Sequence, residues 1–113
     1  MMQFDVDERG GVATLALSGD VMGGPDGAAL HDHLQRLKTE GRRNVVVDLD
    51  GVRFMNSSGL GMLIGALTTM RNGGGDLRLA RVGQRVQSLL VITKLAAVFQ
   101  CYDSVDEAVA SFQ

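Results

Sequence analysis

The sequence has 113 residues, of which 45% are hydrophobic, so one folded domain spanning residues 1–113 is expected and wholesale disorder is excluded. The formal net charge is -2, from 11 basic and 13 acidic residues, which offers no patch for direct nucleic acid binding. No apolar run reaches the roughly 20 residues of a membrane helix and no signal peptide pattern opens the chain, so we expect a cytoplasmic domain without membrane insertion.

The first elements in chain order are two strands and a helix. Apolar and acidic residues alternate from Phe4 to Asp7, and the stretch VATLALSG follows a glycine turn, so residues 2–18 predict a hairpin. Pro25 suits the first turn of a helix in which leucines repeat at helical spacing. Gly41 is a natural stop for this helix.

The rest of the chain alternates strands and helices. NVVVDLDGV, residues 44–52, predicts a strand buried on both faces, and apolar residues from Leu60 to Met70 mark one face of a helix that ends at NGGG. A strand at DLRLARV, a helix at QRVQSLLVI, a short strand at AVFQCY and a helix capped by Ser104 complete the order ββαβαβαβα. This order predicts an α/β fold with a mixed sheet and right-handed crossovers.

The residue types that usually carry catalysis or bind metals give weak signals. His31 and His33 are two apart on a predicted helix, so they do not face each other and we expect a solvated helix face. The stretch MNSSG lacks the first glycine of a nucleophile elbow, and GGPDG lacks the Gly-Lys of a phosphate-binding loop. Cys101 has no disulfide partner and is expected to be a small core residue. These patterns favour a protein that is not an enzyme and has no metal or cofactor.

Two adjacent serines, Ser57 and Ser58, follow the central strand at the sheet end where functional loops tend to lie. Either Asn56 or Ser57 could cap the next helix by accepting a hydrogen bond from an N–H of its first turn. One cap needs only one side chain, so one hydroxyl is left over. A phosphate there would add a charge of about -1.5 to -2 beside a helix N-terminus that tolerates negative charge. The pattern predicts a phosphorylation switch that a partner protein reads.

Three glycines interrupt the same helix, although glycine costs about 1 kcal/mol relative to alanine inside a helix. Gly61 and Gly65 are four apart and line one strip, while Gly59 lies in the first turn. Two compatible interpretations remain open. The glycines allow the helix to pack closely on the sheet, or they form a smooth groove beside Ser57 that lets another protein approach.

The segment DLDGVRFMNSSGLG, residues 48–61, resembles the central motif of the STAS domain in the anti-sigma factor antagonist family. The resemblance extends over LALSGDV before it and LARVGQRVQSLLVITKLAAVFQCYDSVDEAV after it, which is nearly the whole chain. It implies a small α/β domain with a mixed sheet of four or five strands, about four helices and no enzymatic activity. It also implies that the unphosphorylated protein binds an anti-sigma factor that is a serine kinase, and thereby frees the sigma factor. Phosphorylation weakens that complex, and a metal-dependent serine phosphatase reverses the modification.

By the same resemblance, the phosphoacceptor is Ser57, and we expect the partner to contact Asn56, Ser58, Gly59, Leu60 and Gly61. The family usually has Asp at the position of Asn56 and an acid at the position of Met22. Because Asn caps a helix as well as Asp does, we expect the missing charge to alter partner preference and not to abolish phosphorylation.

Two alternative functions use the same fold. One is an unphosphorylated STAS subunit that acts as a scaffold in a lipid-transport ATPase or a larger signalling complex. The other is a nucleotide-binding module, which no Gly-Lys cradle in this sequence supports. The oligomeric state is left open by the sequence.

Overall fold

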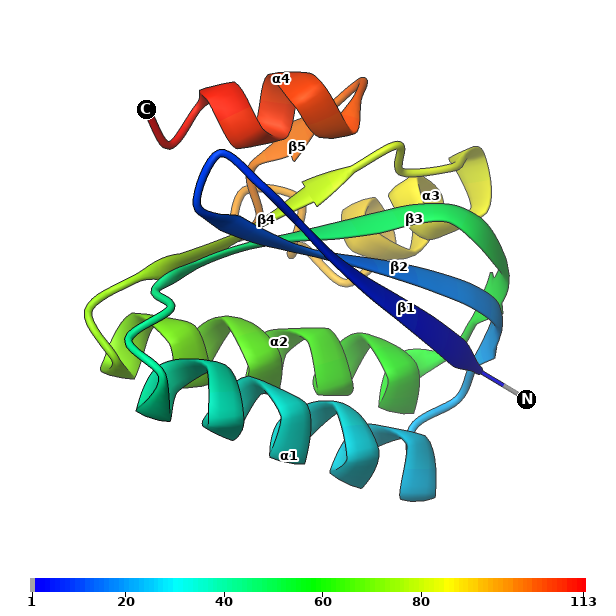
Figure 1. Cartoon of the computed structure of the whole chain (residues 1–113). Coiled ribbons are helices and arrows are strands. Elements are labelled where there is room, and N and C mark those ends of the chain that lie inside the picture. The colour runs from blue at the N-terminus through cyan, green and yellow to red at the C-terminus, as the bar shows by residue number, and fades with distance from the viewer. Residues whose placement is uncertain (1) are drawn as a thin grey trace.

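The structure, a computed structural model, describes residues 2–113. Over these residues it contains one five-stranded sheet, in the order β1-β2-β3-β4-β5, and four helices (Figure 1). The strands are β1 (Gln3–Arg9), β2 (Val12–Val21), β3 (Asn44–Met55), β4 (Asp76–Ala80) and β5 (Cys101–Tyr102). The helices are α1 (Pro25–Thr39), α2 (Ser57–Asn72), α3 (Gln84–Ile92) and α4 (Val105–Ala110). The order ββαβαβαβα and the predicted fold class are confirmed.

The sheet is mixed, because β1 and β2 form an antiparallel hairpin whereas the pairs β2–β3, β3–β4 and β4–β5 are parallel. In Figure 1 the helices α1 and α2 lie side by side under one face of the sheet, and α4 lies over the other face. Val21 at the end of β2 is paired with Met55 at the end of β3. The carboxyl ends of the two strands are therefore neighbours, and α1 and α2 begin just beyond them.

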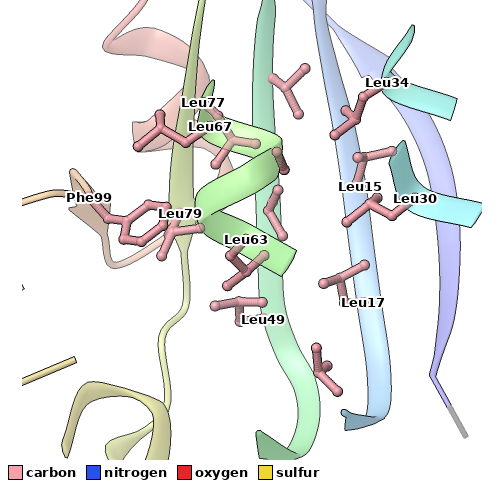
Figure 2. Close-up of a cluster of buried hydrophobic side chains, with 14 of the residues drawn as sticks. Leu15, Leu17, Leu30, Leu34, Leu49, Leu63, Leu67, Leu77, Leu79 and Phe99 are labelled. Carbon is pink, nitrogen blue, oxygen red and sulfur yellow. The ribbon is translucent and has the colours of Figure 1, made fainter. Parts of the chain in front are cut away.

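The larger core fills the space between the sheet and helices α1, α2 and α3. Figure 2 shows leucines of β2, β3 and β4 converging with leucines of α1 and α2, next to Phe99. A smaller core beneath α4 contains Val12, Val46, Ala80, Ala108 and Val109. Val46 belongs to the smaller core and Val47 to the larger one, and neither side chain is exposed to solvent. The first half of β3 is thus buried on both faces, as its continuous apolar run predicts.

The second half of β3 departs from the sequence prediction. The strand continues to Met55 instead of ending at residue 52, and most of its residues from 50 onward are exposed. Its pairing with β2 is interrupted by two register shifts, between Ala16 and Ser18 and between Gly19 and Asp20. Because these irregularities depend on the partner strand, the sequence of β3 alone does not reveal them.

One single-residue prediction is wrong, and the prediction of a solvated face for His31 and His33 holds only in part. Cys101 is exposed and is not a core residue, because β5 is a two-residue edge strand that pairs only with Leu79 and Ala80. His33 does not lie on a fully solvated face, since its ring is half-buried at 5.7 Å from the ring of Phe4. This burial lowers the pKa of His33.

An ion pair joins β3 to the turn after β4. Arg81 donates to the Asp48 carboxylate from Nε at 3.0 Å and from Nη2 at 2.6 Å, and only 9% of the Asp48 side chain is exposed. Arg81 has φ 55°, a left-handed conformation that is uncommon for a residue with a Cβ, and its N–H donates to the Tyr102 carbonyl at 2.9 Å. These bonds hold the turn that directs the chain into α3.

The same ion pair makes a prediction about acid stability. Burial alone would raise the pKa of Asp48, but hydrogen bonds from Arg81 and from the Asp50 N–H leave it below its usual value. A lowered folded pKa contributes stability that is complete above about pH 4 and is lost as the pH falls through the folded value. We expect Asp48→Asn to lower the free energy of unfolding at pH 7 by about 1–3 kcal/mol and to flatten its decline in acid.

Urea unfolding followed from pH 7 to pH 2 measures this effect. The control is Asp32→Asn, because Asp32 is exposed on α1 and forms no ion pair within residues 2–113. An Asp48→Asn protein whose acid decline matched that of the unsubstituted chain would contradict the assignment.

Candidate functional site

The site lies where β3 passes into α2, and Asn56 caps the helix. The Asn56 Oδ1 accepts a hydrogen bond from the Gly59 N–H at 2.8 Å, and the Asn56 N–H donates to the Val21 carbonyl at 3.3 Å. The sequence left the cap open between Asn56 and Ser57. The structure assigns it to Asn56, and Ser57 becomes the first residue of α2.

Ser57 and Ser58 are both exposed, and neither hydroxyl forms a hydrogen bond to another group within residues 2–113. They differ in their surroundings. Ser58 lies against the loop between β2 and α1, where a Cβ added to Gly23 would come within 3.1 Å of the Ser58 Cβ. The first turn of α2 contains no acidic residue, so a phosphate on Ser57 would meet the positive end of the helix without a neighbouring carboxylate in that turn.

The three glycines of α2 have different roles. A Cβ added to Gly59 would lie 2.0 Å from the Val21 carbonyl oxygen, so only glycine lets the first turn of α2 approach the end of β2 this closely. A Cβ added to Gly61 or Gly65 would have nothing within 4 Å, and both residues are exposed. Close packing therefore explains Gly59, and an open helix surface describes Gly61 and Gly65.

The five residues predicted to bind the partner differ in how far they are exposed to solvent. Gly59 and Leu60 are buried, with 2% of Leu60 exposed, and Asn56 is half-buried in its capping role. Ser58 and Gly61 are exposed. The structure thus places all five residues at one helix start, but Gly59 and Leu60 are closed to direct contact with a docking protein unless the fold changes.

A hollow of about 280 Å³ lies between α1 and α2. Its lining includes Gly23 and Gly24 of the loop, Ser58, Met62 and Gly65. The sequence suggested a groove beside Ser57, but this hollow instead adjoins Ser58 and does not include Ser57 or Gly61 among its lining residues. The physical reason is that α1 packs along the side of α2 that carries Ser58 and Met62.

An exposed ion pair that sequence reasoning missed also lies at this end of the sheet. Arg53 donates to both carboxylate oxygens of Asp20, at 3.1 Å each. The Arg53 hydrogen bond lowers the pKa of Asp20, and Asp20 in turn raises the pKa of Arg53. The Arg53 side chain is 78% exposed, so the pair lies in solvent at the strand ends. The pair links the ends of β2 and β3, and the register shifts between these strands hide it in the sequence.

Neither a cluster of metal ligands nor a membrane-spanning helix is found among the described residues. Within residues 2–113, no group of three or more histidine, cysteine or acidic side chains is placed to hold a metal ion. None of the helices described over the same range is both long enough and apolar enough to span a membrane.

Comparisons with known proteins relate this chain to one family. A family model described as the STAS domain matches residues 3–108. The anti-sigma F factor antagonist of Paenibacillus polymyxa is 26% identical over 106 residues, which cover 91% of this chain and 88% of the relative. An anti-sigma-B factor antagonist of Staphylococcus aureus is 32% identical over 66 residues, covering 58% of this chain and 61% of the relative. The solved structure of the Bacillus cell fate determinant SpoIIAA in its phosphorylated form superposes with a TM-score of 0.76 at 14% identity, covering 98% of this chain and 100% of that one.

The contrast between Gly59 and Gly61 makes a second prediction. We expect Gly59→Ala to lower the free energy of unfolding by about 1–3 kcal/mol, because the added methyl group must displace the backbone at Val21. Gly61→Ala should instead raise it by about 0.5–1 kcal/mol, since its Cβ enters open space and alanine favours the helix.

Urea unfolding of the two alanine variants measures both effects, and each variant is the control for the other. Equal changes in the free energy of unfolding, in the same direction for both variants, would contradict the packing assigned to Gly59.

Proposed function

The chain belongs to the STAS domain family, and on this premise we propose that it is an anti-sigma factor antagonist switched by phosphorylation of Ser57. One observation carries the proposal. Ser57 is exposed, without a hydrogen bond to its hydroxyl within residues 2–113, and it begins α2 directly after the capping Asn56. The serine is thus accessible to a kinase and is not needed as the cap.

In the proposed cycle, the unphosphorylated protein binds an anti-sigma factor that is a serine kinase, and the sigma factor is released. The kinase then transfers phosphate to Ser57, which weakens the complex, and a serine phosphatase removes the phosphate. The modification breaks no hydrogen bond of the Ser57 hydroxyl to residues 2–113 and adds negative charge at a helix N-terminus. It therefore changes the surface that the partner meets more than it changes the fold.

The residues around Ser57 have two proposed roles, partner contact and positioning of the helix start. Ser58 and Gly61 are exposed and are proposed to touch the partner, whereas Asn56, Gly59 and Leu60 hold the helix start in position. The protein acts by recognition and needs no catalytic group or cofactor of its own. A regulator of sigma factors works in the cytoplasm, and that location is part of the proposal.

Asn56 and Met22 favour a second candidate function. Where the family usually has acids, this chain has an amide and an exposed thioether, with 44% of Met22 accessible. A surface without these charges also suits a STAS subunit that is never phosphorylated and acts as a scaffold in a transporter or a larger signalling complex. The kinase experiment below separates the two functions.

The third prediction concerns the phosphoacceptor. Incubation with an anti-sigma serine kinase of the same organism and ATP should attach one phosphate to Ser57, which phosphopeptide mass spectrometry would locate. Ser57→Ala should not be labelled. Ser58→Ala should still be labelled at Ser57, at a lower rate if Ser58 contacts the kinase.

If Ser57→Ala were labelled as strongly as the unsubstituted chain, Ser57 would not be the acceptor. If no such kinase labelled the protein and a transport ATPase co-purified with it, the scaffold function would replace the switch.

The fourth prediction separates signalling from stability. Ser57→Asp should weaken kinase binding at least tenfold in calorimetry, because it places negative charge where the phosphate would lie. Its free energy of unfolding should stay the same or rise by about 0.3–1 kcal/mol, since negative charge is favourable at a helix N-terminus.

The uncharged variant Ser57→Asn is the matched control and should bind more tightly than Ser57→Asp. A clear loss of stability in Ser57→Asp would show that the site is buried in solution, against the exposed position described above.

A further inference from the structure

A second apolar surface lies beside α3. Phe54 is 41% exposed, Val91 is 59% exposed and Ile92 is 77% exposed. Two adjoining hollows share Gln84, Ser88 and Ile92, one of them lined also by Phe54 and the other also by Val91. We name this continuous surface the α3 shelf and define it by Phe54, Val91 and Ile92.

The packing of α3 does not explain why the shelf is apolar. Only Val86 and Leu90 of this helix are buried, and together with the half-buried Leu89 they supply its contact with the larger core. Val91 and Ile92 come directly after Leu90, and their side chains are exposed to solvent. Neighbouring exposed apolar side chains with a polar rim are typical of a protein interaction site, whereas scattered ones are not.

The shelf adjoins the proposed switch. Phe54 and Met55 line one of its hollows, and they directly precede Asn56 and Ser57 in the chain. Two peptide units separate Met55 from Ser57, which limits the distance between their Cα atoms to about 7 Å. A protein that contacts Ser57 therefore lies within reach of the shelf.

Charge distinguishes between the possible occupants. Arg85 is the one ionisable side chain among the lining residues of the two hollows, and it forms no ion pair within the described part of the chain. Two copies paired symmetrically through the shelf would bring Arg85 toward Arg85 with no carboxylate from either lining. A different protein, with an apolar segment and a carboxylate to meet Arg85, fits the surface better.

We propose that the α3 shelf is a docking surface for the anti-sigma partner, which inserts an apolar segment over Ile92 and Phe54 and places a carboxylate opposite Arg85. This inference rests on the proposed function, because it takes the partner that phosphorylates Ser57 as the occupant. The shelf supplies apolar contact area that the small exposed residues Ser57, Ser58 and Gly61 lack. A phosphate on Ser57 has the same sign as the carboxylate that Arg85 attracts, so the modification opposes docking.

Calorimetry with the anti-sigma serine kinase that labels Ser57 tests the shelf. Ile92→Lys should weaken binding at least tenfold, and Arg85→Glu should weaken it more than Arg85→Lys does. The matched control is Val6→Lys, because Val6 is also an exposed apolar residue, at 47%, but lies on the edge strand β1. Val6→Lys should bind within about twofold of the unsubstituted chain.

The outcomes separate the two proposals. If a kinase labels Ser57 but binds Ile92→Lys as tightly as the unsubstituted chain, the docking role of the α3 shelf is overturned and the phosphorylation switch at Ser57 still stands. The absence of any kinase that labels Ser57 overturns both. Thermal unfolding verifies that each variant is folded, and Val91→Ser takes the place of Ile92→Lys if the latter is not. A dimer detected by sedimentation and abolished by Ile92→Lys would assign the shelf to a second copy and overturn the proposal.

Discussion

The close approach of α2 to the carbonyl of Val21 is the constraint on which the candidate site depends. This oxygen accepts the Asn56 N–H, and it lies where any Cβ at position 59 would have to go. Gly59 meets the steric requirement, and the Asn56 side chain binds the Gly59 N–H to close the first turn. Because these contacts fix the first turn on the side that faces β2, Ser57 lies on the outer side of the helix start, where it is exposed.

The site separates residues that hold the structure from those that face solvent. Gly59 and Leu60 are buried, so they set the position of α2 and are removed from direct contact with other proteins. Ser57 and Ser58 are exposed, and neither hydroxyl forms a hydrogen bond to another group within residues 2–113. This separation allows a surface charge to be added without loss of the core, which is the physical requirement for a reversible phosphorylation switch. The exposed apolar residues Val91 and Ile92 of α3, together with Phe54, form a surface that adjoins the start of α2.

Several features could be predicted because their causes are local in sequence. The leucines of α1 and α2 repeat at helical spacing, and the β-branched run of β3 marks a strand covered on both faces. Other features could not be predicted because their causes come from distant segments. The exposure of Cys101 follows from the shortness of β5, and the partial burial of His33 follows from Phe4 on β1. The ion pair of Asp20 with Arg53 depends on register shifts in a neighbouring strand.

The sequence by itself determined the order of the elements, the hydroxyl pair after β3 and the two residues that could cap α2. These features arise from hydrogen bonds and side-chain periodicity within a few residues, which a linear chain displays directly. Only the tertiary structure decided that Asn56 is the cap, that Gly59 is a packing residue and that the hollow adjoins Ser58. It also decided that Phe54 and Ile92 meet on one surface. The packing of Gly59, the position of the hollow and the shared surface of Phe54 and Ile92 depend on how parallel crossovers bring separate segments together, and that arrangement is settled by packing across the sheet.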